Sequence, residues 1–113
     1  MTTAAVAELD ELFQALADPT RRAVVERLGR GPAATSELAE PFDMALPSFT
    51  QHLGVLERCG LVASHKTGRV RTYRLVPEPL SQARSWLDAQ HDLWERRLDQ
   101  FDQYVATMKE AQQ

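Results

Sequence analysis

The spacing of apolar residues predicts a helix near each end of the chain. Leu9 and Phe13 lie on one face of a helix over about residues 5–17. Near the other end, a seven-residue repeat predicts one long helix over about residues 78–109. The repeat consists of Leu87, Trp94, Phe101 and Met108, with His91, Leu98 and Val105 four positions after the first three. Such a helix would span roughly 48 Å at 1.5 Å per residue, more than the rest of this chain could cover.

A helix of this length would leave a stripe of large apolar side chains in water if the protein were a monomer. Burial against a second copy of the chain removes the stripe from water, so the repeat predicts a homodimer. The first helix is expected to join the interface. The predicted interface residues are Leu9, Phe13, Leu87, His91, Trp94, Leu98, Phe101 and Val105. The alternative is a terminal helix that folds back entirely onto its own domain.

A second helix is predicted to start at Asp18 and Pro19. Asp is a common N-cap residue, and Pro is tolerated in the first turn of a helix. Arg21 and Arg22 follow in that first turn, where the helix dipole slightly disfavours positive charge. Two explanations are open for these residues: a surface ion pair or packing against an acidic neighbour, or contact with a phosphate.

Residues 35–59 are predicted to form a helix-turn-helix. A short helix capped by Thr35 or Ser36 precedes a turn and a second helix that starts near Leu46. One side of the second helix carries an apolar stripe made of Leu46, Phe49, Leu53 and Leu56. The other side carries Ser48, Gln51, Gly54, Val55 and Arg58. An ordinary surface helix carries Glu and Lys there, whereas hydroxyl, amide and guanidinium groups suit base edges and phosphates.

Residues 62–76 are predicted to form a β-hairpin around the turn Thr67-Gly68-Arg69. Arg71 and Arg74 add further positive charge to its returning strand. A basic ribbon directly after a candidate recognition helix predicts a winged helix-turn-helix, whose wing touches the DNA backbone or minor groove. As an alternative, the charges protect an exposed edge strand from aggregation. The predicted fold is mainly α with a small β-hairpin, in a single domain over residues 1–113.

The distribution of charge supports a nucleic-acid partner, although the chain of 113 residues has a formal net charge of −3. Residues 44–87 hold two acidic and six basic residues, whereas residues 1–43 and 88–113 are both net acidic. Affinity for phosphates depends on this local charge more than on the total.

Composition also argues against several classes of protein. No segment approaches 18 consecutive apolar residues, so no membrane partner is expected, and the acidic N-terminus does not resemble a secretory signal. The single Cys59 cannot form an internal disulfide and fits the reducing cytoplasm. The three His residues lie in three separate predicted elements, and there is no Gly-rich phosphate loop. No enzyme, catalytic residue or cofactor is therefore expected.

Four segments together resemble the ArsR-type (ArsR/SmtB) family of winged helix-turn-helix transcriptional repressors. They are LADPTRRAVVERL (16–28), SELAE (36–40), PSFTQHLGVLERCGLV (47–62) and GRVRTYRL (68–75). The resemblance covers roughly residues 9–106. It implies a homodimer, built from the first and last helices, that binds an inverted-repeat operator in double-stranded DNA and acts as a repressor; repression of its own operon is compatible with the absence of metal ligands. The alternative function is a winged-helix module that binds protein and not DNA.

The resemblance also implies DNA contacts at particular residues. The expected set is Ser48, Thr50, Gln51, His52, Arg58, Lys66, Arg69 and Arg71. On a helical wheel, Ser48 and Gln51 point most directly outward, so we expect them at base edges, with Thr50 and His52 at phosphates. A buried, hydrogen-bonded position beside Phe49 is equally expected for His52. The wing residues would hold the backbone or minor groove.

Some positions depart from the family pattern. Many relatives have Ser where this chain has Ala45, which leaves Asp43 as the candidate cap for the recognition helix. Many also have Lys at the position of Gly54, so one phosphate contact is missing.

The thiolate positions of metal-sensing relatives correspond to Ala34 and Ser36, so no metal site and no small-molecule or metal effector are expected. His91 with Glu95 could supply two ligands, but a single polar residue in the seam is the preferred interpretation.

Overall fold

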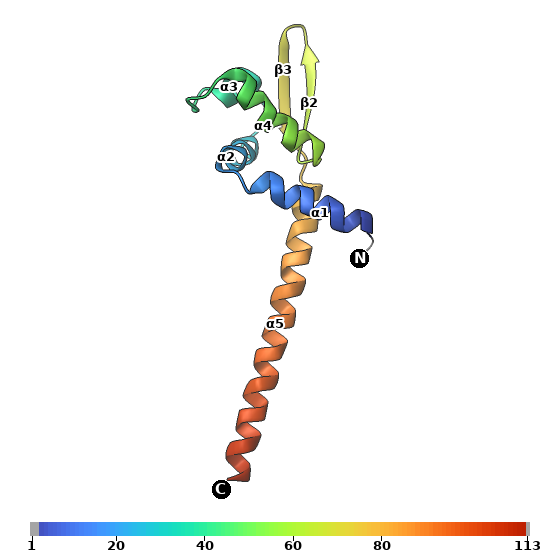
Figure 1. Cartoon of the computed structure of the whole chain (residues 1–113), viewed down its shortest axis with the longest axis vertical. Helices are drawn as coiled ribbons and strands as arrows, with labels where there is room; N and C mark the ends of the chain where they lie inside the picture. Colours follow the sequence, from blue (N-terminus) through green and yellow to red (C-terminus); the bar gives the residue numbers. More distant parts are fainter. Residues whose placement is uncertain (1–2, 113) are drawn as a thin grey trace. The chain divides into compact units, whose positions relative to one another are not determined.

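The computed structural model describes residues 3–112, with side chains from Ala7 onward. Its elements, in chain order, are α1 (Thr3–Leu16), α2 (Pro19–Leu28), β1 (Ala33–Ala34), α3 (Thr35–Ala39), α4 (Leu46–Arg58), β2 (Val62–Thr67), β3 (Val70–Leu75) and α5 (Glu78–Ala111) (Figure 1). The predicted fold class, mainly helical with a β-hairpin wing, is confirmed. The chain forms two compact units, Met1–Gln82 and Ala83–Gln113.

The core of the first unit forms around the buried side of α4. Phe49, Leu53 and Leu56 are each 0% exposed, and the Phe42 ring stacks on Phe49 with centroids 5.4 Å apart. The predicted apolar stripe of α4 is thus confirmed at these three residues. It is wrong at Leu46, which is 56% exposed. Leu46 opens the helix, and helical side chains lean toward the N-terminus, so its side chain extends past the end of the core.

The helix ends confirm one predicted cap and correct two others. Asp18 caps α2, because its Oδ2 accepts a hydrogen bond from the Arg21 amide at 3.0 Å. The N-cap of α3 is Ala34, not Thr35 or Ser36, and the Glu37 side chain accepts from the Ala34 amide at 3.1 Å. Ala45 is the N-cap of α4 without any side-chain hydrogen bond, so Asp43 does not replace the missing cap.

The sheet of the first unit has three antiparallel strands in the order β1-β3-β2. The predicted hairpin is confirmed as β2 and β3, with Gly68 at φ 63° in the tight turn, where a residue without Cβ is favoured. The sequence did not predict β1, which has two residues. It pairs Ala33 with Tyr73 and Ala34 with Thr72, and so attaches the base of the hairpin to the start of α3.

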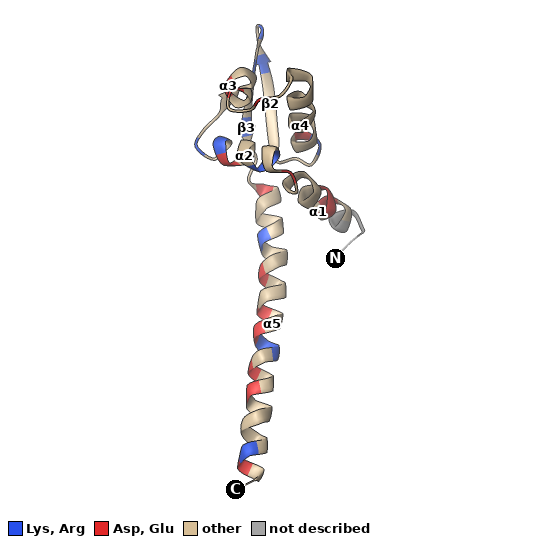
Figure 2. Ribbon diagram, turned by 60° about the vertical axis from the view of Figure 1, so that its left-hand side comes forward, with Lys and Arg blue, Asp and Glu red and all other residues tan. Residues whose placement is uncertain are grey.

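The second unit consists of helix α5 from Ala83 onward. The whole of α5 has 34 residues, about 51 Å at 1.5 Å per residue. Acidic and basic residues are interspersed along it (Figure 2), and Arg84–Asp88 forms an ion pair one turn apart at 3.8 Å. Within the described residues, no helix combines the length and the apolar character needed to cross a membrane.

The predicted seven-residue repeat of α5 is a stripe of exposed side chains, apart from Val105, which is partly buried. Trp94 and Phe101 are 60% and 62% exposed, and Leu87, Leu98 and Met108 are exposed as well. The structure adds apolar residues beside this stripe that the repeat did not include: Trp86, Leu93 and Tyr104. The apolar face of α5 is therefore wider than a two-position seam.

Candidate nucleic-acid interface

The side of α4 that faces away from the core carries the predicted reading residues. Ser48, Thr50 and Gln51 are all exposed, one turn or less from the buried Phe49 and Leu53. Thr50 Oγ1 donates a hydrogen bond to the Pro47 carbonyl at 3.0 Å, so its hydroxyl proton is used within the helix. Ser48 and Gln51 present an exposed hydroxyl and an exposed amide, the groups that read base edges in a major groove.

Arg58 lies one turn after Gly54 on the same side of α4. Together with Thr50, Gln51 and Val55, these residues line an open hollow of about 470 Å³. A Cβ added to Gly54 would lie 3.6 Å from Arg58 Nη1, which is an ordinary van der Waals contact. The space therefore does not require glycine, and nothing in the structure explains Gly54.

The wing carries its positive charge near the turn between β2 and β3 (Figure 2). Lys66 and Arg71 face each other across the hairpin, Arg69 lies in the turn, and all three are exposed. This places the three predicted wing residues together at the end of a ribbon, as backbone or minor-groove contacts require.

Arg71 is also connected to the recognition helix through residues that the sequence did not indicate. Its Nη1 donates to Ser64 Oγ at 3.0 Å, and Ser64 Oγ donates to Glu57 Oε1 at 2.6 Å. Glu57 belongs to the last turn of α4, so the chain of bonds connects α4 to the wing. The hairpin register, in which Ser64 pairs with the residue two after Arg71, was the one available signal for this contact.

Tyr73 holds the base of the wing against the core. It is buried, as expected for a packing residue, and the neighbouring Thr35 Oγ1 donates to the Arg71 carbonyl at 3.4 Å. Burial, followed by the charge of Glu57, raises the pKa of Tyr73 above its usual value, against smaller opposing effects of Arg71 and Thr35. Tyr73 is therefore an uncharged phenol in this setting, suited to packing.

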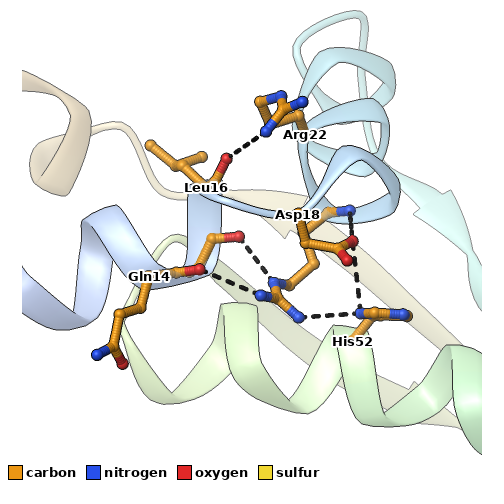
Figure 3. Close-up of polar contacts among 7 residues, drawn as sticks. Gln14, Leu16, Asp18, Arg22 and His52 are labelled. Carbon is orange, nitrogen blue, oxygen red and sulfur yellow. Dashed lines mark hydrogen bonds and ion pairs between the residues drawn. The ribbon is translucent and has the colours of Figure 1, made fainter.

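Arg21 and Arg22 make contacts that neither sequence-based explanation anticipated (Figure 3). Arg21 donates from Nε to the Ala15 carbonyl at 2.7 Å and from Nη2 to the Gln14 carbonyl at 3.1 Å. Arg22 donates from Nη1 to the Leu16 carbonyl at 2.9 Å. The last carbonyl groups of a helix lack partners within it, so these two guanidinium groups from α2 cap the end of α1.

His52 extends from α4 to the same cluster. Its Nδ1 lies 3.0 Å from Arg21 Nη1 and 3.7 Å from Asp18 Oδ2, and its side chain is 23% exposed (Figure 3). The His52 side chain is thus partly buried and hydrogen-bonded, in agreement with the second of the two positions predicted from the sequence. Its role toward DNA remains a prediction.

Asp18 should stabilise the fold in a pH-dependent way. Burial alone would raise the pKa of Asp18, but the hydrogen bond from the Arg21 amide, the charge that His52 has when its ring is protonated, and the charge of Arg21 outweigh it and lower that pKa below 3.8. The charged cap is therefore fully effective above pH 3.8 and is lost as the pH falls through the lowered pKa. We expect Asp18→Ala to reduce the free energy of unfolding by about 1 kcal/mol at pH 7.

Urea unfolding of wild type and Asp18→Ala at pH 7 and near pH 2 measures this effect, and the difference between the two proteins should shrink at the lower pH. Asp18→Asn is the matched control, because Asn retains the cap but does not titrate. An Asp18→Ala effect that is the same at both pH values would show that the carboxylate charge contributes nothing.

The recognition helix has one buried side and one exposed side, and a basic two-stranded ribbon follows it. This arrangement defines a winged helix-turn-helix DNA-binding protein. Comparison with known proteins agrees: a family model for a helix-turn-helix domain matches residues 16–65. The chain belongs to the ArsR family of winged helix-turn-helix transcriptional regulators, a family of regulators and not of enzymes. Operator binding and homodimerisation are typical of this family.

Three similar proteins illustrate the relationship. HTH-type transcriptional regulator Rv2034 of Mycobacterium tuberculosis is 43% identical over 96 residues, which cover 85% of this chain and 87% of that protein. Transcriptional repressor SdpR of Bacillus subtilis is 29% identical over 79 residues, covering 70% of this chain and 88% of SdpR. The crystal structure of the ArsR family transcriptional regulator RHA00566 is 57% identical, with a TM-score of 0.77, covering 79% of this chain and 92% of that chain.

Among the described residues, one group of potential metal ligands lies together. His91, Asp92 and Glu95 on α5 offer ligand atoms within 4.8 Å of one another, and all three residues are exposed. His91 Nε2 and Glu95 Oε1 are 3.6 Å apart, one helical turn along α5. Exposed groups of this kind are common without a metal, so the arrangement is also that of a surface ion pair.

Proposed function

We propose that this protein is a homodimeric transcriptional repressor that reads an inverted-repeat operator with α4 and holds the adjacent backbone with its wing. The observation that carries the proposal is the two-sided character of α4. One side is completely buried at Phe49, Leu53 and Leu56, so the opposite side is held rigidly outward with Ser48 and Gln51 exposed. Rigid presentation of polar groups on one helix face is what base reading in a major groove requires.

The proposed contacts divide into two kinds. Ser48 and Gln51 meet base edges, and Gln51 is suited to a bidentate pair with adenine. Phosphate and minor-groove contacts come from Thr50, His52, Arg58, Lys66, Arg69 and Arg71. The link from Glu57 through Ser64 to Arg71 supports this division, because it connects this part of the wing directly to the reading helix.

The proposed dimer buries the exposed apolar face of α5. The proposed interface comprises Leu9, Phe13, Leu87, His91, Trp94, Leu98, Phe101 and Val105, of which Leu9 is already 8% exposed within its own chain and has little surface left to bury. Trp94 and Phe101, each about three-fifths exposed, support the proposal because such large apolar stripes usually mark protein interfaces. In each protomer, residues 5–17 and 78–109 serve dimerisation, and residues 35–59 and 62–76 form the DNA-binding part of a single domain. Two copies present two α4 helices to two half-sites about one helical turn apart.

The proposal includes no metal or small-molecule effector. Ala34 and Ser36 have no thiolate to offer, and the exposed His91 lies in the predicted seam, where one polar residue sets the register of paired helices. A regulator of this kind would repress its own operon without an inducer. Its proposed place of action is the cytoplasm, where bacterial DNA lies.

Two substitutions should separate base reading from backbone binding. Gln51→Ala removes a pair to one base, so we expect it to relax preference at one operator position, by about 1–3 kcal/mol of discrimination.

Arg69→Ala removes a phosphate contact, so we expect it to weaken binding to all sequences and to reduce the slope of log K against log salt by about 1. Bound fragments are first selected from genomic DNA, and the affinities are then measured by fluorescence anisotropy at several salt concentrations, with and without zinc.

The same measurements decide between the proposed function and its alternative. Unchanged specificity in Gln51→Ala would contradict the base-reading assignment. If wild type binds no DNA even at about 50 mM salt, where phosphate contacts are strongest, the repressor proposal fails and a protein-binding module replaces it.

A further inference from the structure

We propose that Arg21 is a positioning residue for DNA binding, which holds the His52 imidazole with its proton on Nε2 and directs that N–H toward a DNA phosphate. The inference rests on the proposed function and assigns a role to a residue outside the expected set of DNA contacts. The juxtaposition that carries it joins three elements: the end of α1, the start of α2 and the middle of α4 (Figure 3).

Arg21 is held in one orientation by hydrogen bonds at its own backbone and along its side chain. Asp18 Oδ2 accepts from the Arg21 amide, and the Ala15 and Gln14 carbonyl groups accept from Nε and Nη2. The guanidinium group is planar with fixed donor directions, so two bonds to the end of α1 also fix the direction of Nη1. Nη1 is the group that meets His52, at 3.0 Å.

The contact between Arg21 and His52 determines where the imidazole carries its proton. Arginine only donates hydrogen bonds and has no acceptor atom. Nδ1 of His52 must therefore accept, which leaves the single proton of the neutral ring on Nε2. Asp18 Oδ2, 3.7 Å from the same Nδ1, favours the opposite arrangement because a carboxylate accepts and would draw a proton to Nδ1. Arg21 is the residue that decides between the two.

The free edge of the ring is available to a ligand. Its second nitrogen points away from Arg21 and Asp18 (Figure 3), and the side chain is 23% exposed. His52 lies on the flank of α4, about 100° around the helix from the exposed Gln51, so we expect its open edge to meet a phosphate at the border of the base-reading surface. A neutral N–H binds a phosphate oxygen through a directed hydrogen bond. If the proton moved to Nδ1, Nε2 would present a lone pair to the phosphate and repel it.

Arg21→Met tests the inference, and Arg22→Met is its matched control. Each change removes one positive charge and one guanidinium cap at the end of α1, but of the two arginines Arg21 is the one with a hydrogen bond to His52. We expect Arg21→Met to weaken operator binding about tenfold, the effect of losing one hydrogen bond to a charged group. Arg22→Met should stay within about threefold of wild type. Thermal unfolding is recorded for both variants.

A spectroscopic readout separates this role from general stabilisation. Nitrogen NMR of the labelled imidazole, assigned with His52→Gln and recorded at about pH 8, distinguishes the two neutral tautomers. We expect the proton on Nε2 in wild type and Arg22→Met, and a shift toward Nδ1 in Arg21→Met. If Arg21→Met does not fold, Arg21→Lys, which keeps the charge but not the planar fork, replaces it and should show the same shift.

A double-mutant cycle completes the test. Gln at position 52 donates from its amide whatever its neighbour does, so Arg21→Met should have little effect on affinity in the His52→Gln background. Equal losses in both backgrounds, or an unchanged tautomer in Arg21→Met, would overturn the inference. If wild type binds no DNA, the proposed function fails together with the phosphate contact. The tautomer in the free protein then still decides whether Arg21 orients His52.

Discussion

A variant in which Trp94 and Phe101 are both replaced by Glu should sediment as a monomer and bind the operator about 100-fold more weakly than wild type, or weaker still. Both side chains are about three-fifths exposed on α5, seven residues apart. In the proposed dimer they are buried, and two carboxylates per chain would then be desolvated next to those of the other copy. A monomer carries one α4 helix and loses the advantage of binding two half-sites together.

The control for this variant introduces two Glu side chains at other positions of α5. Ala89 and Gln103 lie on the other side of the helix from Trp94 at 100° per residue, so Ala89→Glu with Gln103→Glu should remain dimeric. Sedimentation velocity at micromolar concentration measures both variants, and circular dichroism checks that α5 stays helical. A dimer that survives Trp94→Glu with Phe101→Glu would contradict the proposed interface.

Replacement of a leucine of α4 by alanine should have very different effects on the free energy of unfolding at Leu53 and at Leu46. Leu53 is 0% exposed, so Leu53→Ala leaves a cavity and should lower the free energy of unfolding by about 2–5 kcal/mol. Small proteins are stabilised by about 5–15 kcal/mol in total, so this is a large share. Leu46 is 56% exposed, and Leu46→Ala should change the free energy of unfolding by about 0.5 kcal/mol or less.

Urea unfolding at one fixed protein concentration measures both leucine variants, because the stability of a dimer depends on concentration. The pair is its own control: the chemical change, the helix and the helical face are the same, and only the burial differs. Equal effects at the two positions would mean that Leu46 is covered in solution.

Helical spacing was sufficient to predict the side of each long element that is buried or left exposed. Phe49, Leu53 and Leu56 follow a periodicity that depends on neighbouring residues alone, and the same is true of the α5 repeat. The periodicity failed at Leu46 because the end of a core is set by the elements around it, not by the helix itself. The two residues of β1 gave no signal either, since they become a strand only by pairing with β3.

The residues of the candidate site also differ in whether a local sequence pattern could predict them. The exposure of Ser48, Gln51 and the wing arginines follows from local patterns, and the structure has them exposed. The contact of Arg21 with His52 joins residues 31 positions apart, and no local pattern encodes such a pair. Glu57 and Ser64 illustrate an intermediate case, because their link to Arg71 could be suspected once the register of the hairpin was known.

The short strand β1 pairs only with the base of the wing, so we expect the end of the wing to be less well ordered. Its pairing with β3 ends at Ala34 and Thr72, so the hairpin from Lys66 to Arg71 is a ribbon of two strands without a third. Isolated two-stranded ribbons are only marginally stable in water, and their amide protons exchange readily with solvent. In the proposed complex, part of the attraction between Arg69 and a phosphate would then be offset by the conformational entropy lost when the ribbon becomes ordered. In return, we expect such a ribbon to adapt to minor grooves of different width, so that the proposed repressor can bind operators that differ in shape.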